Sequence, residues 1–152
     1  MLQQEGVYQV HYFCTNNGIF GLFDYHFTKT APNYQLFYLM TNVMGRERVE
    51  ASTDHDAIGV IATRQDHGEY ALMLYNRANA PVKVLVPNFS SDYSYRVYDY
   101  SYEWYVKNHM ITDGVPPVVS GQTVLVDHKD VTEWTVPALG VLVLVNETGS
   151  KL

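Results

Sequence analysis

Seven aromatic residues lie within the thirteen positions 93–105 and form the most distinctive chemical feature of this sequence. If residues 94–102 form a strand, Tyr98, Tyr100 and Tyr102 share one face, with rings about 6.5–7 Å apart. Such a row, extended by Trp104 and Tyr105, could stack on successive sugar rings. Alternatively, the same face packs on a neighbouring domain and leaves its hydroxyls at a wet rim. We favour packing, because tyrosine is common at such rims.

Paired carboxylates, which would indicate glycoside hydrolysis, are not marked by the sequence. The glutamates lie among polar neighbours at expected strand ends or turns, and we expect them to be solvated: Glu5, Glu47, Glu50, Glu69, Glu103, Glu133 and Glu147. No Gly-x-Ser-x-Gly nucleophile elbow and no glycine-rich phosphate loop occurs. We therefore expect no catalytic residue in this chain.

Three short segments combine histidine with aspartate and could in principle hold a metal ion: 54–56, 66–67 and 127–130. All three fall in expected turns, where the hydrogen bonds that aspartate makes to the backbone already explain its presence. Their spacing matches neither a zinc site nor a calcium loop. We expect no metal site and no cofactor.

Charge and hydropathy exclude two classes of partner. The net charge is -6 with only 10 Lys and Arg, so no basic stripe is available to neutralise phosphates and nucleic acid is not expected. No apolar run reaches the roughly 18–20 residues that cross a membrane. A folded, soluble protein is expected, because 47% of the residues are hydrophobic. The sequence leaves open whether it is secreted or cytoplasmic.

From Arg46 onward, short apolar or alternating segments recur between turn signals. Seven such segments are expected as strands: 57–65, 69–76, 82–86, 94–102, 122–128, 133–136 and 139–145. The turn at 66–68 should join the first two as a hairpin, whereas 103–121 is expected to be irregular. The pattern predicts a mainly β fold, an antiparallel β-sandwich of about 7–9 strands.

The first 45 residues follow a different pattern. Residues 19–27 are apolar on both faces and are expected to form a strand. A helix is predicted over 31–44, with Thr30 as N-cap, Pro32 in the first turn and Gly45 as C-terminal cap. Its apolar stripe consists of Leu36, Phe37, Met40, Val43 and Met44. A lone helix cannot bury such a stripe, so its partner is expected to lie partly outside this chain.

The order of these motifs resembles the end of a (β/α)8-barrel glycosidase followed by an appended β-sandwich. It is similar to glycoside hydrolase family 39, which includes β-xylosidases and α-iduronidases. The resemblance rests on the segments 18–24, 30–40, 69–76, 80–84, 98–104, 114–116 and 136–145.

The resemblance implies two parts, a remnant of the barrel end at 1–45 and an accessory sandwich at 46–152. The catalytic glutamates of that family follow the fourth and seventh barrel strands, which would precede residue 1. The expected function is therefore a non-catalytic C-terminal fragment of a glycoside hydrolase acting on plant or other polysaccharide. Its expected partner is the catalytic barrel or a second copy of this chain.

Two other functions stay open. The first is a carbohydrate-binding module that holds an oligo- or polysaccharide on Tyr98, Tyr100, Tyr102, Trp104 and Tyr105. The second is a self-contained enzyme.

Overall fold

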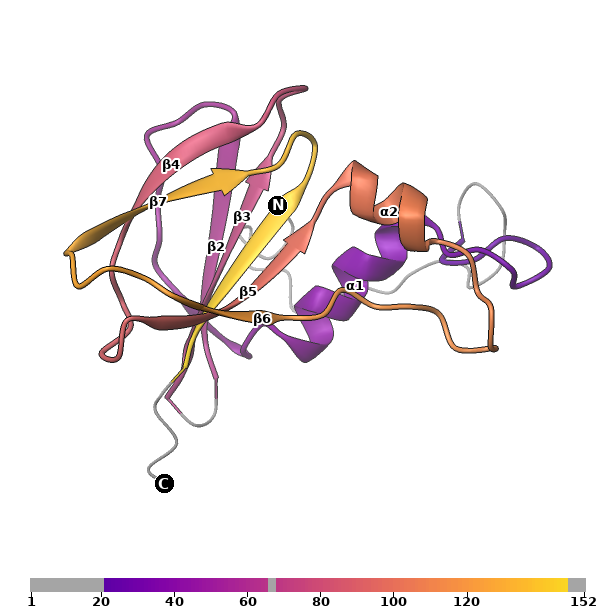
Figure 1. Ribbon diagram of the computed structural model, residues 1–152, viewed down its shortest axis with the longest axis horizontal. Helices are drawn as coiled ribbons and strands as arrows, with labels where there is room; N and C mark the ends of the chain where they lie inside the picture. The colour runs from indigo at the N-terminus through magenta and orange to yellow at the C-terminus, as the bar shows by residue number, and fades with distance from the viewer. Residues whose placement is uncertain (1–20, 66–67, 148–152) are drawn as a thin grey trace.

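The computed structural model describes residues 21–65 and 68–147. Within these ranges the protein is mainly β, with eight strands and two helices (Figure 1). The strands are β1 (Glu47–Val49), β2 (Ile58–Arg64), β3 (Tyr70–Asn76), β4 (Val82–Pro87), β5 (Ser94–Tyr100), β6 (Gln122–Leu125), β7 (Val131–Val136) and β8 (Val141–Asn146). The helices are α1 (Pro32–Asn42) and α2 (Tyr102–Asn108).

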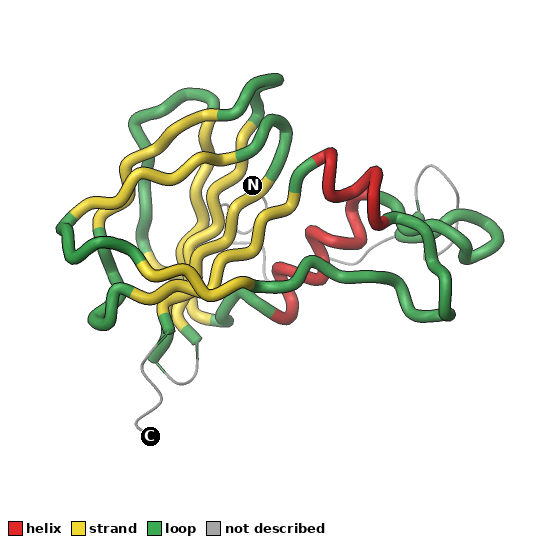
Figure 2. Tube along the Cα trace, viewed as in Figure 1, coloured by secondary structure: helices red, strands yellow, loops and turns green. Residues whose placement is uncertain are grey.

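The strands form two antiparallel sheets, as expected for the predicted β-sandwich. The larger sheet has the order β1-β2-β3-β8-β5-β6, and the smaller consists of β4 and β7 alone. The predicted hairpin is confirmed, since β2 pairs with β3 and Ile61 lies opposite Met73. In Figure 2 the two helices lie to one side of the strands and the small sheet to the other.

Two apolar clusters fill the two sides of the larger sheet. One lies between this sheet and the helices, the other between this sheet and the smaller one. Strand β8 contributes to both, because Val143 faces the helices and Leu144 faces the small sheet, each with 0% exposure. A strand covered on both faces has no polar alternation, which explains the continuous apolar run of 141–145.

Helix α1 begins at Pro32, one residue after the predicted start at residue 31, and its caps differ from those expected. Ala31 is the N-cap and makes no side-chain bond, whereas the Thr30 amide donates to His109 O at 2.8 Å, beyond α2. The helix ends at Asn42, before Gly45. A Cβ at Gly45 would lie 2.2 Å from the Arg64 carbonyl oxygen. This glycine therefore permits close contact with β2 and does not cap the helix.

The buried stripe of α1 consists of Gln35, Leu39 and Val43, with Leu39 fully enclosed. It packs on the larger sheet in one cluster with Ile61 and Met73, while Leu36 and Met40 are only partly buried. The stripe of α1 therefore has a partner within the chain, whereas the expectation that a further partner lies outside the chain stays a prediction. The expected division at residue 45 stays a prediction.

The strand expected over 19–27 does not form in its described part, 21–27. The Asp24 carboxylate accepts from the amides of Thr28, at 2.6 Å, and Lys29, at 3.1 Å, and Phe27 has a φ of 55°. These are the features of a turn. The expected β/α unit is therefore not present in the described residues, although its helix is. No helix of the described residues is long and apolar enough to span a membrane.

Candidate functional site

The predicted row of three tyrosines on one strand does not form. Strand β5 ends at Tyr100, and the Ser101 hydroxyl accepts the Trp104 amide at 3.1 Å as the N-cap of α2. Tyr102 therefore lies in helix α2 and not on the strand. The prediction that residues 103–121 are irregular is wrong for the part that belongs to this helix. Tyr98 and Tyr100 remain together on the face of β5 that meets the helices.

Two of the five predicted rings instead connect β5 and α2 to the start of α1, and a third packs against one of them. The Tyr100 hydroxyl donates to Pro32 O at 3.0 Å, and the Tyr105 hydroxyl donates to Thr30 O at 3.2 Å. Trp104 packs edge-on against Tyr100, with ring centroids 5.8 Å apart. Burial raises the pKa of both Tyr100 and Tyr105 above the ordinary tyrosine value. These rings therefore make packing contacts within the chain.

Of the five rings, only Tyr102 is largely exposed, at 70%, whereas Tyr100 is exposed by 7%. Tyr98, Trp104 and Tyr105 are partly buried against the helix-side cluster. A role of these residues in sugar stacking stays a prediction; Tyr102 is the most exposed of the five, and Trp104 borders a cleft.

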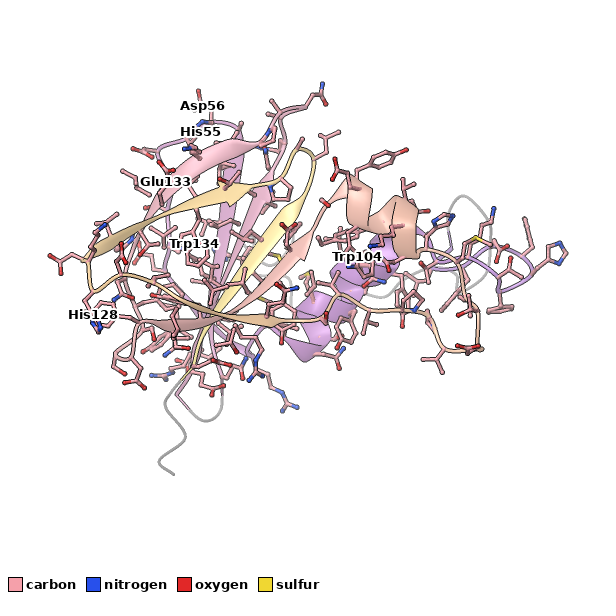
Figure 3. The ribbon with its side chains drawn as sticks, in the orientation of Figure 1. His55, Asp56, Trp104, His128, Glu133 and Trp134 are labelled. Atoms are coloured by element: carbon pink, nitrogen blue, oxygen red, sulfur yellow. The ribbon has the colours of Figure 1, made fainter. Side chains whose placement is uncertain are left out.

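Trp104 also lines a small polar cleft of about 370 Å³ beside the start of α2. The cleft is formed by the inner face of β5, by β6 and by the residue that caps α2; its lining comprises Val97, Asp99, Ser101, Trp104, Ser120, Gln122 and Val124. Figure 3 shows Trp104 at α2, well separated from Trp134 inside the sandwich. The cleft joins an indole to several hydrogen-bonding side chains.

Asp99 is the charged group of this cleft. Partial burial raises its pKa, and the nearby negative charge of Glu103 raises it further. Within the described residues, neither the Asp99 carboxylate nor the Gln122 amide has a hydrogen-bond partner, so both are available to a ligand. The sequence does contain a signal for Asp99: strand alternation places this charged residue on the same face as apolar Val97 and Tyr95.

A larger and mostly apolar slot of about 710 Å³ lies at the side of the sandwich. One wall consists of residues 49–55 and the opposite wall of residues 83–87 in β4. Its floor is formed by β2 and β3 through Val60, Leu72 and Leu74. Polar groups line its rim, including Glu50, Asp54 and Lys83.

Three of the glutamates take part in ion pairs at the surface of the described residues. Glu47 pairs with Arg64, and Glu133 pairs with Lys83 at 2.8 Å. Glu147 pairs with Arg96, also at 2.8 Å. Although desolvation opposes it, hydrogen bonds from Ser94, Arg96 and Thr123 hold the pKa of Glu147 below its ordinary value. Each of these glutamates is therefore occupied by a separate basic side chain.

No group of three or more metal-ligating side chains occurs in ranges 21–65 and 68–147. The predicted turn segment 66–67 and Glu5 lie outside the described residues. His55 bonds locally, since its Nδ1 accepts the Ala57 amide at 3.1 Å.

No protein-family model matches the sequence, and no curated protein is significantly similar to it. Solved structures of glycoside hydrolases, in contrast, share its fold. A family 30 subfamily 8 xylanase from Clostridium acetobutylicum superposes with a TM-score of 0.62 and 13% identity, over 86% of this chain and 32% of the xylanase.

Two further glycoside hydrolases extend the likeness to other families. A family 44 xyloglucanase from Paenibacillus polymyxa gives a TM-score of 0.55 and 15% identity, over 76% of this chain and 22% of its own. A family 51 α-L-arabinofuranosidase from Thermotoga petrophila gives a TM-score of 0.53 and 18% identity, over 75% of this chain and 28% of the enzyme. The chain thus spans between a fifth and a third of these enzymes, and at such identities the likeness establishes the fold alone.

Proposed function

We propose that this chain is a non-catalytic accessory β-sandwich of a glycoside hydrolase that acts on plant or other polysaccharide, and that it supports the catalytic barrel. The observation that carries the proposal is the repeated match to glycoside hydrolases of three families, each over a minor part of the enzyme. The finer assignment to family 39 rests on the sequence motifs alone.

The arrangement of carboxylates supports a non-catalytic role. Glycoside hydrolysis requires two carboxyl groups about 5–10 Å apart across a bound sugar. Glu47, Glu133 and Glu147 are held in separate surface ion pairs. Burial raises the pKa of Asp99, but the carboxylate that raises it further, Glu103, lies on the first turn of α2 outside the cleft lining.

The proposed partner is the barrel of the same enzyme. Helix α1 already covers one face of the larger sheet within this chain. The mostly apolar slot beside β4 is the surface that retains room for a partner.

The coding sequence upstream of Met1 tests this function. We expect it to encode a barrel with glutamates after its fourth and seventh strands, and we expect the purified 152-residue chain to leave aryl glycosides unhydrolysed. Hydrolysis by this chain that disappears in Asp99→Asn would contradict the proposal and indicate a self-contained enzyme.

Carbohydrate binding is the second candidate function, favoured by the polar cleft. An indole together with unpaired amide, carboxylate and hydroxyl groups suits a neutral sugar, whose hydroxyls both donate and accept. The cleft supplies these groups through Trp104, Gln122, Asp99 and Ser120.

Titration of the ¹⁵N-labelled chain with xylo- and cello-oligosaccharides tests the cleft. The indole signal of Trp104 should shift, while that of Trp134, between the two sheets, should not. Trp104→Ala should abolish binding, whereas Tyr102→Ala, at the exposed side of α2, should keep it. Equal loss in both variants would favour an exposed aromatic platform, and no shift at millimolar sugar would exclude carbohydrate binding.

A further inference from the structure

We propose that the slot beside β4 receives one extended segment of the polypeptide that carries the catalytic barrel, and that this segment pairs with β4 as a third strand of the small sheet. The inference rests on the proposed function, because it names the surface and the kind of chain through which the accessory domain joins its enzyme.

The hydrogen-bonding pattern of the small sheet shows which β4 groups are free. Asn88 lies opposite Asp130, and its amide donates to the Asp130 carbonyl at 2.7 Å. Hydrogen-bonded pairs alternate with non-bonded ones in an antiparallel ladder. Val86, Val84 and Val82 therefore bond to β7, whereas the backbone groups of Lys83 and Leu85 point away from it.

No strand of the described residues pairs with this second edge of β4. Lys83 and Leu85 thus offer two N–H donors and two C=O acceptors along an open edge. Exposed edges of this kind are templates for an added strand. Such edges are usually blunted by proline or by a bulge, but here the one proline, Pro87, stands at the end of the strand.

The walls of the slot fit a single extended chain. Five consecutive residues of β4, Lys83 to Pro87, line one side, so both faces of the strand border the slot. At about 3.4 Å per residue this wall is about 17 Å long. The opposite wall, residues 49–55, is the purple trace that rises beside β4 to the start of β2 in Figure 1.

The same walls disfavour two other occupants. A second copy that offered its own β4 would bring its β7 against residues 49–55, because the other edge of that β4 is bound to β7. A sugar would find few polar partners, because valine, leucine and alanine dominate the floor. The occupant should therefore alternate apolar residues, facing Leu72 and Leu74, with polar ones facing water.

Charge at the rim refines the chemistry of that segment. Glu50 and Asp54 place two carboxylates on the wall opposite β4, whereas the Lys83 ammonium is already paired with Glu133 at 2.8 Å. Lysine or arginine at the outward positions of the incoming strand would therefore be favoured over aspartate or glutamate.

The test uses the full 152-residue chain and a blocked nine-residue peptide that alternates valine with threonine and lysine. A peptide with serine in place of each valine is the control. Residue-resolved amide exchange by NMR should show slowed exchange at Lys83 and Leu85 with the valine peptide only. The edges of β1 and β6 should remain unchanged.

Two substitutions at one position distinguish the contribution of the backbone to peptide binding from that of the side chain. Leu85→Pro removes an N–H that points into the slot and leaves the bonds to β7 in place, so peptide affinity should fall roughly 10-fold or more. Leu85→Thr keeps that N–H and alters only a side chain that is 71% exposed, so affinity should stay within about twofold. Circular dichroism checks that both variants fold. If Leu85→Pro does not fold, Leu72→Asn on the slot floor is used in its place.

Three results would overturn the proposal: no protection of Lys83 and Leu85 at millimolar peptide, protection only at another edge, or a dimer without peptide that Leu85→Pro dissociates. The last result would assign the edge to a second copy. A reading frame without a barrel would remove the proposed function but not the peptide result, so the two failures can be told apart.

Discussion

At the residue scale, Gln35 shows how one buried polar side chain connects distant segments. It is fully buried in the stripe of α1, its Nε2 donates to Pro117 O at 2.7 Å, and its Oε1 accepts the Val119 amide at 3.0 Å. The long segment between α2 and β6 is thereby held against α1. The apolar pattern of the sequence does not mark this residue, because a stripe defined by hydrophobicity leaves out a buried amide.

Replacing this amide should destabilise the fold. Gln35→Leu leaves the Pro117 carbonyl and the Val119 amide without partners, so we expect a loss of about 2–4 kcal/mol in the free energy of unfolding. Urea titration followed by circular dichroism measures it. Gln122→Ala is the matched control and should change stability by less than about 0.5 kcal/mol, because that amide makes no bond within the described residues. Equal losses would refute the role of Gln35.

Asp99 predicts a pH dependence of stability. Because burial raises the pKa of Asp99 in the folded state above the ordinary value of 3.8, the folded state favours the protonated carboxyl, and the ionised carboxylate opposes folding at neutral pH. Asp99→Asn should therefore stabilise the protein at pH 7, and the gain should vanish as the pH falls below 3.8. Thermal melts of both proteins at matched pH check this. A gain that persists in acid would place its origin elsewhere.

At the element scale, α2 shows where local signals were outweighed. The alternation through residue 102 predicted one long strand, yet the chain turns at Ser101, whose hydroxyl caps the helix. A serine before a glutamate-containing first turn is a capping signal in its own right. The sequence therefore contained the information, but the aromatic alternation competed with it.

Removing this cap should loosen α2 selectively. Ser101→Ala loses the bond to the Trp104 amide, and we expect about 1 kcal/mol of destabilisation with faster amide exchange in residues 102–105. Ser120→Ala provides the control, since both serines line the cleft but only Ser101 caps a helix. Unchanged exchange in α2 would show that the tertiary contacts of Tyr105 suffice to hold the helix.

At the scale of the whole molecule, α1 and both sheets form continuous apolar packing. Leu39 touches the helix-side cluster, and β8 connects that cluster to the one around Trp134. The expected separation at residue 45 predicts that α1 can be weakened alone. The packing predicts instead that the described residues unfold together.

Leu39→Ala distinguishes these alternatives. In a Trp104→Phe background, Trp134 fluorescence reports on the far side of the larger sheet, and circular dichroism reports on the whole chain. We expect both unfolding midpoints to fall together and the free energy of unfolding to decrease by about 2–5 kcal/mol. A Trp134 midpoint that stays unchanged would support a separable N-terminal part.

The sequence by itself determined several strands and one hairpin, because alternation and turn chemistry are local: β2, β3, β4 and β8 lie where their apolar patterns predicted. The tertiary structure decided what covers each apolar face, since that depends on elements far apart in the chain. It placed α1 on the larger sheet, drew the tyrosines into packing contacts, and left β4 with an open edge. None of these follows from periodicity, because a pattern specifies which face is apolar and not which surface will meet it.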